Sequence, residues 1–212
     1  MKFKKNLKIF DQLKEVHLGG LDAQFKLAPK MRFDYDPKKV TSNNPKKAAV
    51  LVLLYPNKND NVTLLLTKRA SYNGTHSAQI SFPGGKFEDS DKNLTQTALR
   101  ESQEEVGLIK QNIKILRKIT DVYIPPSNFL VTPFIGITEI IPTFKRNDEV
   151  AEIIEISLLE LLDDKNIGTV QINNSYMNNI SVPCFKFNNF NVWGATGMIL
   201  SEIKEALKKV QQ

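Results

Sequence analysis

Cysteine, histidine and tryptophan are scarce in this 212-residue chain, which contains one Cys, two His and one Trp. Because a single cysteine, Cys184, cannot pair within the chain, an intramolecular disulfide is excluded and a reducing compartment is expected. The sequence also has no cluster of Cys and His of the kind that binds a structural metal.

Long hydrophobic runs are also missing. The longest run, residues 48–55, has the length of a strand, whereas a membrane-spanning helix needs roughly 20 apolar residues. The lysines near the N-terminus precede no apolar segment of the secretory type, and the last residues carry no peroxisomal address. We therefore expect a cytoplasmic protein with no membrane partner.

Charge is distributed unevenly along the chain. The net charge is +6, and residues 1–47 hold 12 Lys or Arg against 5 Asp or Glu. A basic arm of this kind can meet nucleic acid, but a solvated segment that flanks an active site is the commoner use. We expect no nucleic-acid partner. Hydrophobic residues make up 41% of the chain and charged residues 25%, as in an ordinary globular protein.

The spacing of apolar residues predicts two unequal parts. In residues 1–46, Leu7, Phe10, Leu13 and Val16 recur at helical spacing, and polar, proline-containing sequence follows. We interpret these residues as an N-terminal extension with one helix that packs on the domain or on a second subunit, so a homodimer is possible. Residues 47–212 are predicted to form the main domain.

The main domain is predicted to mix strands and helices. Residues 48–55 and 62–67 are typical of two buried neighbouring strands. Further strands are expected at residues 113–123, 129–138 and 153–156, and a short helix at residues 158–162. Residues 170–172 and 182–187 are predicted to form a hairpin, followed by a helix from about residue 195.

The most informative stretch is residues 82–108. Residues 95–106 contain no Gly or Pro, are rich in good helix formers and end before Gly107, so Glu101, Glu104 and Glu105 fall within about one helical turn of each other. Their mutual repulsion favours a divalent cation such as Mg²⁺, which binds carboxylates together with substrate phosphates. A solvated acidic helix end is the alternative. However, acidic residues at that end oppose the helix dipole, and the adjacent Gly84–Gly85 turn offers N–H groups to a phosphate.

These residues resemble the signature of the Nudix hydrolases, G-x5-E-x7-R-E-U-x-E-E-x-G-U, in which U is aliphatic. The chain differs in its Gly-to-Arg spacing, which is one residue longer, and in Ser102 at the first U position. The first Glu is replaced by Glu88, Asp89 or Asp91. The longer spacing is similar to that of the coenzyme A pyrophosphatase branch.

A second segment of that branch, L-L-T-x-R-S-x-x-L-x-x-H-x-G-Q-x-x-F-P-G-G, resembles residues 65–85 of this chain. The matching residues are Leu65, Leu66, Thr67, Arg69, His76, Gln79, Phe82, Pro83, Gly84 and Gly85. Ala70, Asn73 and Ala78 depart from it. Trp193 to Thr196 resemble a Trp-Gly-Ala-Thr segment that opens the last helix in the same branch.

The resemblance implies an α/β/α sandwich with a mixed β-sheet between helices. It implies that Glu101, Glu105 and Glu104 bind Mg²⁺ or Mn²⁺ and that Arg100 orients a glutamate. Glu104 is the first choice to accept the proton from water, with Glu149 or Glu152 as alternatives. The residues implied to bind substrate are Arg69, His76, Gln79, Phe82, Gly84 and Gly85. From its place at the end of a strand, Tyr123 either stacks on an adenine or lines the pocket, or else belongs to the core, whereas Trp193 is expected in the core.

The implied reaction hydrolyses coenzyme A to 4′-phosphopantetheine and adenosine 3′,5′-bisphosphate. A second interpretation keeps the chemistry but changes the substrate to ADP-ribose, a dinucleotide or a nucleoside triphosphate. A third makes the chain a non-catalytic nucleotide sensor. The full set of Arg100, Glu101, Glu104 and Glu105 argues against a sensor, because a sensor does not need a complete metal-binding face.

Overall fold

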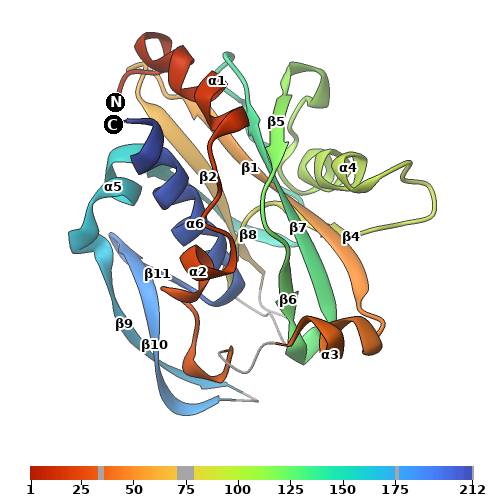
Figure 1. The fold of residues 1–212 in the computed structure, drawn as a ribbon. Helices are drawn as coiled ribbons and strands as arrows, with labels where there is room; N and C mark the ends of the chain where they lie inside the picture. Colours follow the sequence, from red (N-terminus) through yellow and green to blue (C-terminus); the bar gives the residue numbers. More distant parts are fainter. Residues whose placement is uncertain (33–35, 71–78, 175–176, 212) are drawn as a thin grey trace.

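A mixed β-sheet forms the centre of the molecule, with helices on both of its faces (Figure 1). The computed structural model describes residues 1–32, 36–70, 79–174 and 177–211. β1 pairs in parallel with β7 and antiparallel with β2 and β4, which makes the sheet mixed. The strands of this sheet are β1 (Lys46–Pro56), β2 (Val62–Arg69), β3 (Ile80–Ser81), β4 (Gly84–Lys86), β5 (Lys114–Lys118), β6 (Val122–Ile124), β7 (Phe129–Ile137) and β8 (Val150–Ser157).

The apolar run in β1 is buried on both faces. Successive side chains of a strand point to opposite faces of its sheet. Val52 and Leu54 accordingly belong to one core cluster, whereas Leu51 and Leu53 belong to the other. β2 lies beside β1, as the two continuous apolar runs predicted.

A different helix layer covers each face of the sheet. α4 (Leu94–Val106) packs on one face through Ala98 and Val106. α1 (Leu7–Glu15) and α6 (Gly194–Val210) contribute to the core cluster on the opposite face. This arrangement confirms the predicted fold class. In the described part of the chain, no helix has the length and apolar character that crossing a membrane requires.

A smaller antiparallel sheet precedes the last helix. It contains β9 (Ile167–Asn174), β10 (Met177–Phe187) and β11 (Phe190–Trp193) in the order β11-β10-β9, and it follows the short helix α5 (Leu158–Leu162). The predicted hairpin is therefore present as β9 and β10. β11 was not predicted, because four residues are too few to show a periodic pattern.

The N-terminal extension differs from its prediction. One helix was expected, whereas the described part of residues 1–46 contains α1, α2 (Gly20–Phe25) and α3 (Pro37–Ser42). Gly20 begins α2 with a φ of +60°, so the chain turns a corner between α1 and α2 at Gly19 and Gly20. Helices of six residues are stabilised by tertiary contacts rather than by a periodic pattern.

The extension shares the core of the domain. Phe3, Phe10 and Leu13 are at most 1% exposed and lie in the same cluster as residues of β1 and α6. The rings of Phe3 and Phe10 lie 4.9 Å apart. The extension therefore packs on its own domain through these residues.

Candidate active site

A pocket of about 860 Å³ opens between β4, the side of α4 and the first turn of α6. Glu101, Glu105 and Glu149 line it at one end. Five of the residues predicted to bind substrate also line it, namely Arg69, Gln79, Phe82, Gly84 and Gly85. His76, Asn73 and Ala78 lie outside the described residues. The pocket therefore brings together most of the residues selected from the two sequence motifs.

The helix that carries the glutamates is fixed at both ends. The side chain of Asn93 accepts a hydrogen bond from the Gln96 N–H at 3.0 Å, which caps the start of α4. Gly107 ends the helix in the left-handed conformation with a φ of +72°. Because Ala98 and Val106 anchor α4 to the sheet, Glu101 and Glu105 are held one turn apart at the pocket.

The Gly84–Gly85 turn packs directly against these two carboxylates. The Gly84 N–H donates to Glu105 Oε2 at 3.0 Å. A Cβ atom at Gly85 would overlap the carboxylate of Glu101. The sequence assigned the N–H groups of this turn to a phosphate, but here that of Gly84 binds a glutamate. The absence of a side chain at Gly85 lets Glu101 reach its position.

Glu105 is a buried carboxyl group in an acidic surrounding. It is 4% exposed, and burial raises its pKa to about 7. The Gly84 N–H and Arg69 oppose this effect, whereas the charges of Glu101 and Glu149 add to it. Burial also raises the pKa of Glu101, although Arg100 partly offsets that rise. An added positive charge would therefore stabilise the ionised forms of Glu101 and Glu105.

Arg69 lies between Glu105 of α4 and Glu149, which precedes β8. Its Nη1 is 3.7 Å from Glu105 Oε1, and its Nη2 is 3.8 Å from Glu149 Oε2. Arg69 was expected to bind a phosphate of the substrate. Its position beside two carboxylates puts it at the acidic end of the pocket.

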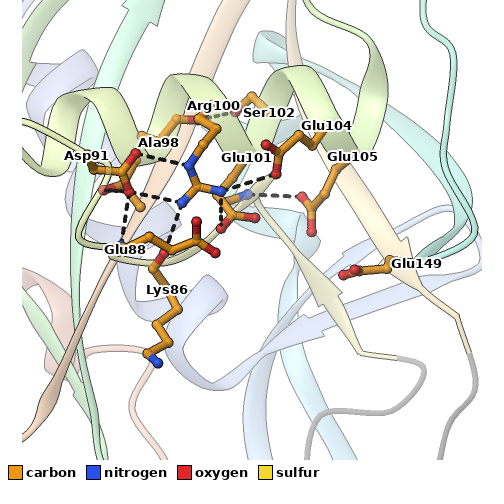
Figure 2. A network of polar contacts seen from close by, with 12 residues as sticks. Lys86, Glu88, Asp91, Ala98, Arg100, Glu101, Ser102, Glu104, Glu105 and Glu149 are labelled. Carbon is orange, nitrogen blue, oxygen red and sulfur yellow. Dashed lines mark hydrogen bonds and ion pairs between the residues drawn. The ribbon is translucent and has the colours of Figure 1, made fainter.

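Arg100 holds the loop and the helix together (Figure 2). Its Nε and Nη2 donate to the two oxygens of Asp91, each at 2.9 Å. Its Nη1 donates to Glu101 Oε1 at 2.9 Å and to Glu104 Oε2 at 3.1 Å. Arg100 does not line the pocket, and its role in orienting a glutamate stays a prediction with which the contact to Glu101 is consistent.

Asp91 is the acidic residue that replaces the first Glu of the signature. Glu88 and Asp89 are exposed, whereas Asp91 is 7% exposed and also accepts a hydrogen bond from Thr97 Oγ1 at 2.9 Å. The hydrogen bonds from Arg100 lower the pKa of Asp91 to about 2. Asp91 is therefore ionised at neutral pH and fixes the Arg100 guanidinium.

The three candidates for the proton acceptor have different positions. The Glu104 side chain is 56% exposed, binds Arg100 and does not line the pocket. Glu152 is exposed on β8, opposite Lys68, and does not line the pocket either. Glu149 lines the pocket, and Figure 2 shows it across from Glu105. The structure therefore brings Glu149, and not Glu104 or Glu152, to the pocket.

The carboxylates at this end have the donor chemistry of a magnesium or manganese site. Among the described residues, no three acidic, His or Cys side chains already form a closed metal-binding cluster. Glu101, Glu105 and Glu149 nevertheless line one pocket, and Glu101 and Glu149 raise the pKa of Glu105. Hard divalent cations prefer such oxygen ligands and leave positions for waters and phosphates. The residues present fit such an ion.

The two aromatic predictions have opposite outcomes. Tyr123 does not line the pocket; its hydroxyl bonds with Asn128 Oδ1 at 3.0 Å and accepts from Asn43 at 3.2 Å. Trp193 was expected in the core but is only partly buried and lines the pocket. Its position follows from the left-handed Gly194, which turns the chain from β11 into α6.

Other pocket residues were not selected from the sequence. Pro29 and Arg32 come from the extension, and Ile124, Pro125 and Phe129 come from the β6–β7 connection. No local motif marks them, because they reach the pocket only through tertiary packing. The one available signal was the proline pair at the end of β6, which predicted a turn but not its neighbours.

Comparisons with known proteins point to one family. The sequence model of the NUDIX domain matches residues 45–169. The chain is 34% identical over 144 residues to proteins described as uncharacterized Nudix hydrolase NudL in Yersinia pestis (strain Pestoides F) and in Yersinia pseudotuberculosis (serotype O:1b, strain IP 31758). In both cases the alignment covers 68% of this chain and 71% of the relative.

A solved structure supports the fold alone. The crystal structure of a MutT/nudix family protein from Enterococcus faecalis matches with a TM-score of 0.54 and 16% identity, over 84% of this chain and 71% of that one. Nudix hydrolases act on small nucleotide derivatives and generally use divalent metal ions. From the matched domain, the relatives and the fold, the chain belongs to the Nudix family and is a pyrophosphohydrolase of nucleoside diphosphate derivatives.

Proposed function

We propose that this enzyme hydrolyses the diphosphate linkage of coenzyme A or its derivatives. The products are 4′-phosphopantetheine, or its acylated form, and adenosine 3′,5′-bisphosphate. One observation carries the proposal: residues of the coenzyme A pyrophosphatase segment, Arg69, Gln79 and Phe82, line the same pocket as Glu101 and Glu105 of the Nudix signature. The shared pocket supports recognition and cleavage of one substrate by both motifs.

The acidic end of the pocket is proposed to hold the divalent ion. Glu101 and Glu105 would ligate Mg²⁺ or Mn²⁺, while Glu104 remains bound to Arg100. When bound, the ion supplies positive charge to the phosphoryl oxygens and lowers the pKa of a coordinated water. Arg100 keeps Glu101 in its ligating orientation, and the missing side chain at Gly85 leaves room for it.

Glu149 is our choice for the proton acceptor. It lines the pocket, and its backbone is fixed because the Glu149 carbonyl accepts a hydrogen bond from the Ala70 N–H at 2.8 Å. Its side chain is 66% exposed, so a proton accepted there can pass to solvent. Arg69 Nη2 lies 3.8 Å from Glu149 Oε2, so an ion pair also holds the Glu149 side chain at the pocket.

The rest of the pocket suits the parts of the substrate that do not react. Ile124, Phe129, Val131 and Trp193 provide an apolar wall beyond the carboxylates. Binding is favoured when an adenine ring or a pantetheine arm packs there, because apolar surface is removed from water. Such a wall is also compatible with ADP-ribose or a dinucleotide, so a product analysis is needed to distinguish these substrates from coenzyme A.

The test is a product analysis over a panel of diphosphate compounds with Mg²⁺ or Mn²⁺. The panel contains free, acylated and oxidised coenzyme A, ADP-ribose and a dinucleotide. We expect the fastest turnover for a coenzyme A compound, with adenosine 3′,5′-bisphosphate as one product. Faster cleavage of ADP-ribose or a dinucleotide would refute the substrate proposal while leaving the diphosphate chemistry intact.

Two further proposals concern the environment of the enzyme. The lone buried Cys184 supports a reducing, cytoplasmic location. The extension packs on its own domain through Phe3, Phe10 and Leu13, so only its exposed residues could contribute to a homodimer. Light scattering in solution tests the predicted homodimer.

A further inference from the structure

The N-terminal extension contributes a cation to the active-site pocket. Arg32 lines the pocket, although it lies outside residues 45–169, which match the Nudix domain. Arg32 ends a 3-10 helical turn, η2 (Lys30–Arg32), that follows α2. The pocket of this chain is therefore incomplete without the extension.

Buried polar contacts fix the segment that carries Arg32. Gln24 of α2 donates to Glu202 Oε2 at 2.8 Å and to the Thr120 carbonyl at 2.9 Å. Ser201 Oγ donates to the Ala23 carbonyl at 2.6 Å. Gln24, Ala23 and Glu202 are all 0% exposed. α2 is thus joined to α6 and to the chain before β6 by hydrogen bonds that water cannot replace.

The guanidinium of Arg32 has a defined direction. The Arg32 N–H donates to the Pro29 carbonyl at 2.8 Å, which closes the turn. Its Nη1 donates to the carbonyl of Tyr123, so the group lies at β6. A guanidinium that is already oriented loses little conformational entropy when it binds an anion.

Arg32 and the acidic end lie on opposite sides of the pocket. β4 pairs with β1, β1 with β7, and β7 with β6. Neighbouring strands are about 4.8 Å apart, so β6, whose Tyr123 carbonyl binds Arg32, lies roughly 14 Å from the Gly84–Gly85 turn of β4. One diphosphate held by Glu101 and Glu105 cannot also reach a group at that distance. Any anion bound by Arg32 therefore belongs to another part of the substrate.

The other pocket cations are less suited to this task. The pocket-lining cations among the described residues are Arg32, Arg69 and Lys86. Arg69 lies within 3.8 Å of two carboxylates. Lys86 is exposed, and in Figure 2 its amino group points away from the acidic cluster. Arg32 is the pocket cation whose guanidinium lies at β6, three strands away from the Gly84–Gly85 turn that contacts Glu101 and Glu105.

We propose that Arg32 is a specificity-determining residue that binds a phosphate which the substrate carries outside the cleaved diphosphate. This inference rests on the proposed function, in which the substrate is coenzyme A and that group is its 3′-phosphate. Arg32 touches no reacting atom, so it affects binding of the phosphorylated substrate rather than the rate of the chemical step.

The test compares coenzyme A with 3′-dephospho-coenzyme A, which differ by this phosphate alone. For Arg32→Ala we expect the KM for coenzyme A to rise roughly tenfold or more, as loss of a charged hydrogen bond implies, with little change in kcat. The KM for the dephosphorylated compound should stay within about twofold of wild type. Arg32→Lys keeps the charge and should restore part of the discrimination.

Lys30→Ala is the matched control, because Lys30 is an exposed cation of the same turn and does not line the pocket. It should leave both KM values unchanged. Equal losses for both substrates in Arg32→Ala would overturn the proposal and assign Arg32 a purely structural role at the Tyr123 carbonyl.

A binding measurement separates this proposal from the proposed function. Calorimetry compares adenosine 3′,5′-bisphosphate with adenosine 5′-monophosphate in the wild type and in Arg32→Ala. Tighter binding of the bisphosphate that disappears in the variant supports the role of Arg32, even if coenzyme A is not hydrolysed. Equal binding of both nucleotides by the wild type contradicts it.

Discussion

Glu105 is the residue where the demands of folding and of catalysis conflict most. It is 4% exposed, accepts one hydrogen bond from Gly84 and lies near the charges of Glu101 and Glu149. A buried carboxylate with acidic neighbours is costly in the absence of a cation. Burial of Glu105 therefore reduces the free energy of folding in the metal-free protein, a cost that the proposed metal ion would offset.

This conflict predicts how stability depends on pH. Burial raises the pKa of Glu105 from 4.5 to about 7. Between these two pH values the metal-free folded protein keeps a proton on Glu105, whereas the unfolded chain has released it. The stabilising effect of that proton is complete below pH 4.5 and is lost as the pH rises through about 7. Glu105→Gln should therefore raise the unfolding free energy at pH 8 by up to about 3 kcal/mol, and much less at pH 5.

Chemical denaturation at the two pH values, with a chelator present, measures this difference. Glu104→Gln is the control, because the Glu104 side chain is 56% exposed and lies outside the pocket. A Glu105→Gln variant that is less stable than wild type at pH 8 would mean that the carboxylate is not under electrostatic strain.

At the scale of elements, α4 and the loop before it act as one unit. Asp91 receives two hydrogen bonds from Arg100 and one each from Thr97 and the Glu88 N–H. Arg100 in turn binds Glu101, so the loop sets the position of a predicted metal ligand. The same loop carries the extra residue that separates this chain from the general signature.

Asp91→Asn should weaken this unit. The hydrogen bonds from Arg100 lower the pKa of Asp91 from 3.8 to about 2, so its stabilising effect is complete above pH 3.8 and is lost as the pH falls through about 2. We expect the variant to lose about 2 kcal/mol of unfolding free energy at pH 7, and less of it at pH 3. Asp89→Asn, in the exposed part of the same loop, should change stability little. Equal stabilities of Asp91→Asn and wild type at pH 7 would contradict the role given to Asp91.

The elements show what the sequence could predict. β1, β2 and α4 were predicted because long apolar runs and a run of helix formers each leave a clear local pattern. α2, β3 and β4 were missed because elements of two to six residues depend on tertiary contacts such as those of Gln24. The order of motifs along the chain predicted that the glutamates would lie beside the glycine turn. Arg32 and Trp193, in contrast, reach the pocket only through tertiary packing.

At the scale of the whole molecule, the extension and the domain form one core. Phe3 and Phe10 are buried in the same cluster as α6, and Arg117 of β5 donates to the carbonyls of Leu13 and Val16 at 3.2 and 2.7 Å. The basic composition of the extension gave no indication of this. The active-site pocket is thus assembled from both faces of a mixed sheet and from a segment that the family signature does not include.

The central claim is that the carboxylates inside the pocket, rather than the acidic helix as a whole, bind the divalent ion that hydrolysis of the diphosphate requires. The most direct measurement is kcat/KM for coenzyme A with saturating Mg²⁺ in two variants of α4. Glu105→Gln should lower it by roughly 100-fold or more, whereas Glu104→Gln should lower it by less than about tenfold. Wild-type activity in a folded Glu105→Gln variant, or a larger loss in Glu104→Gln, would contradict the account.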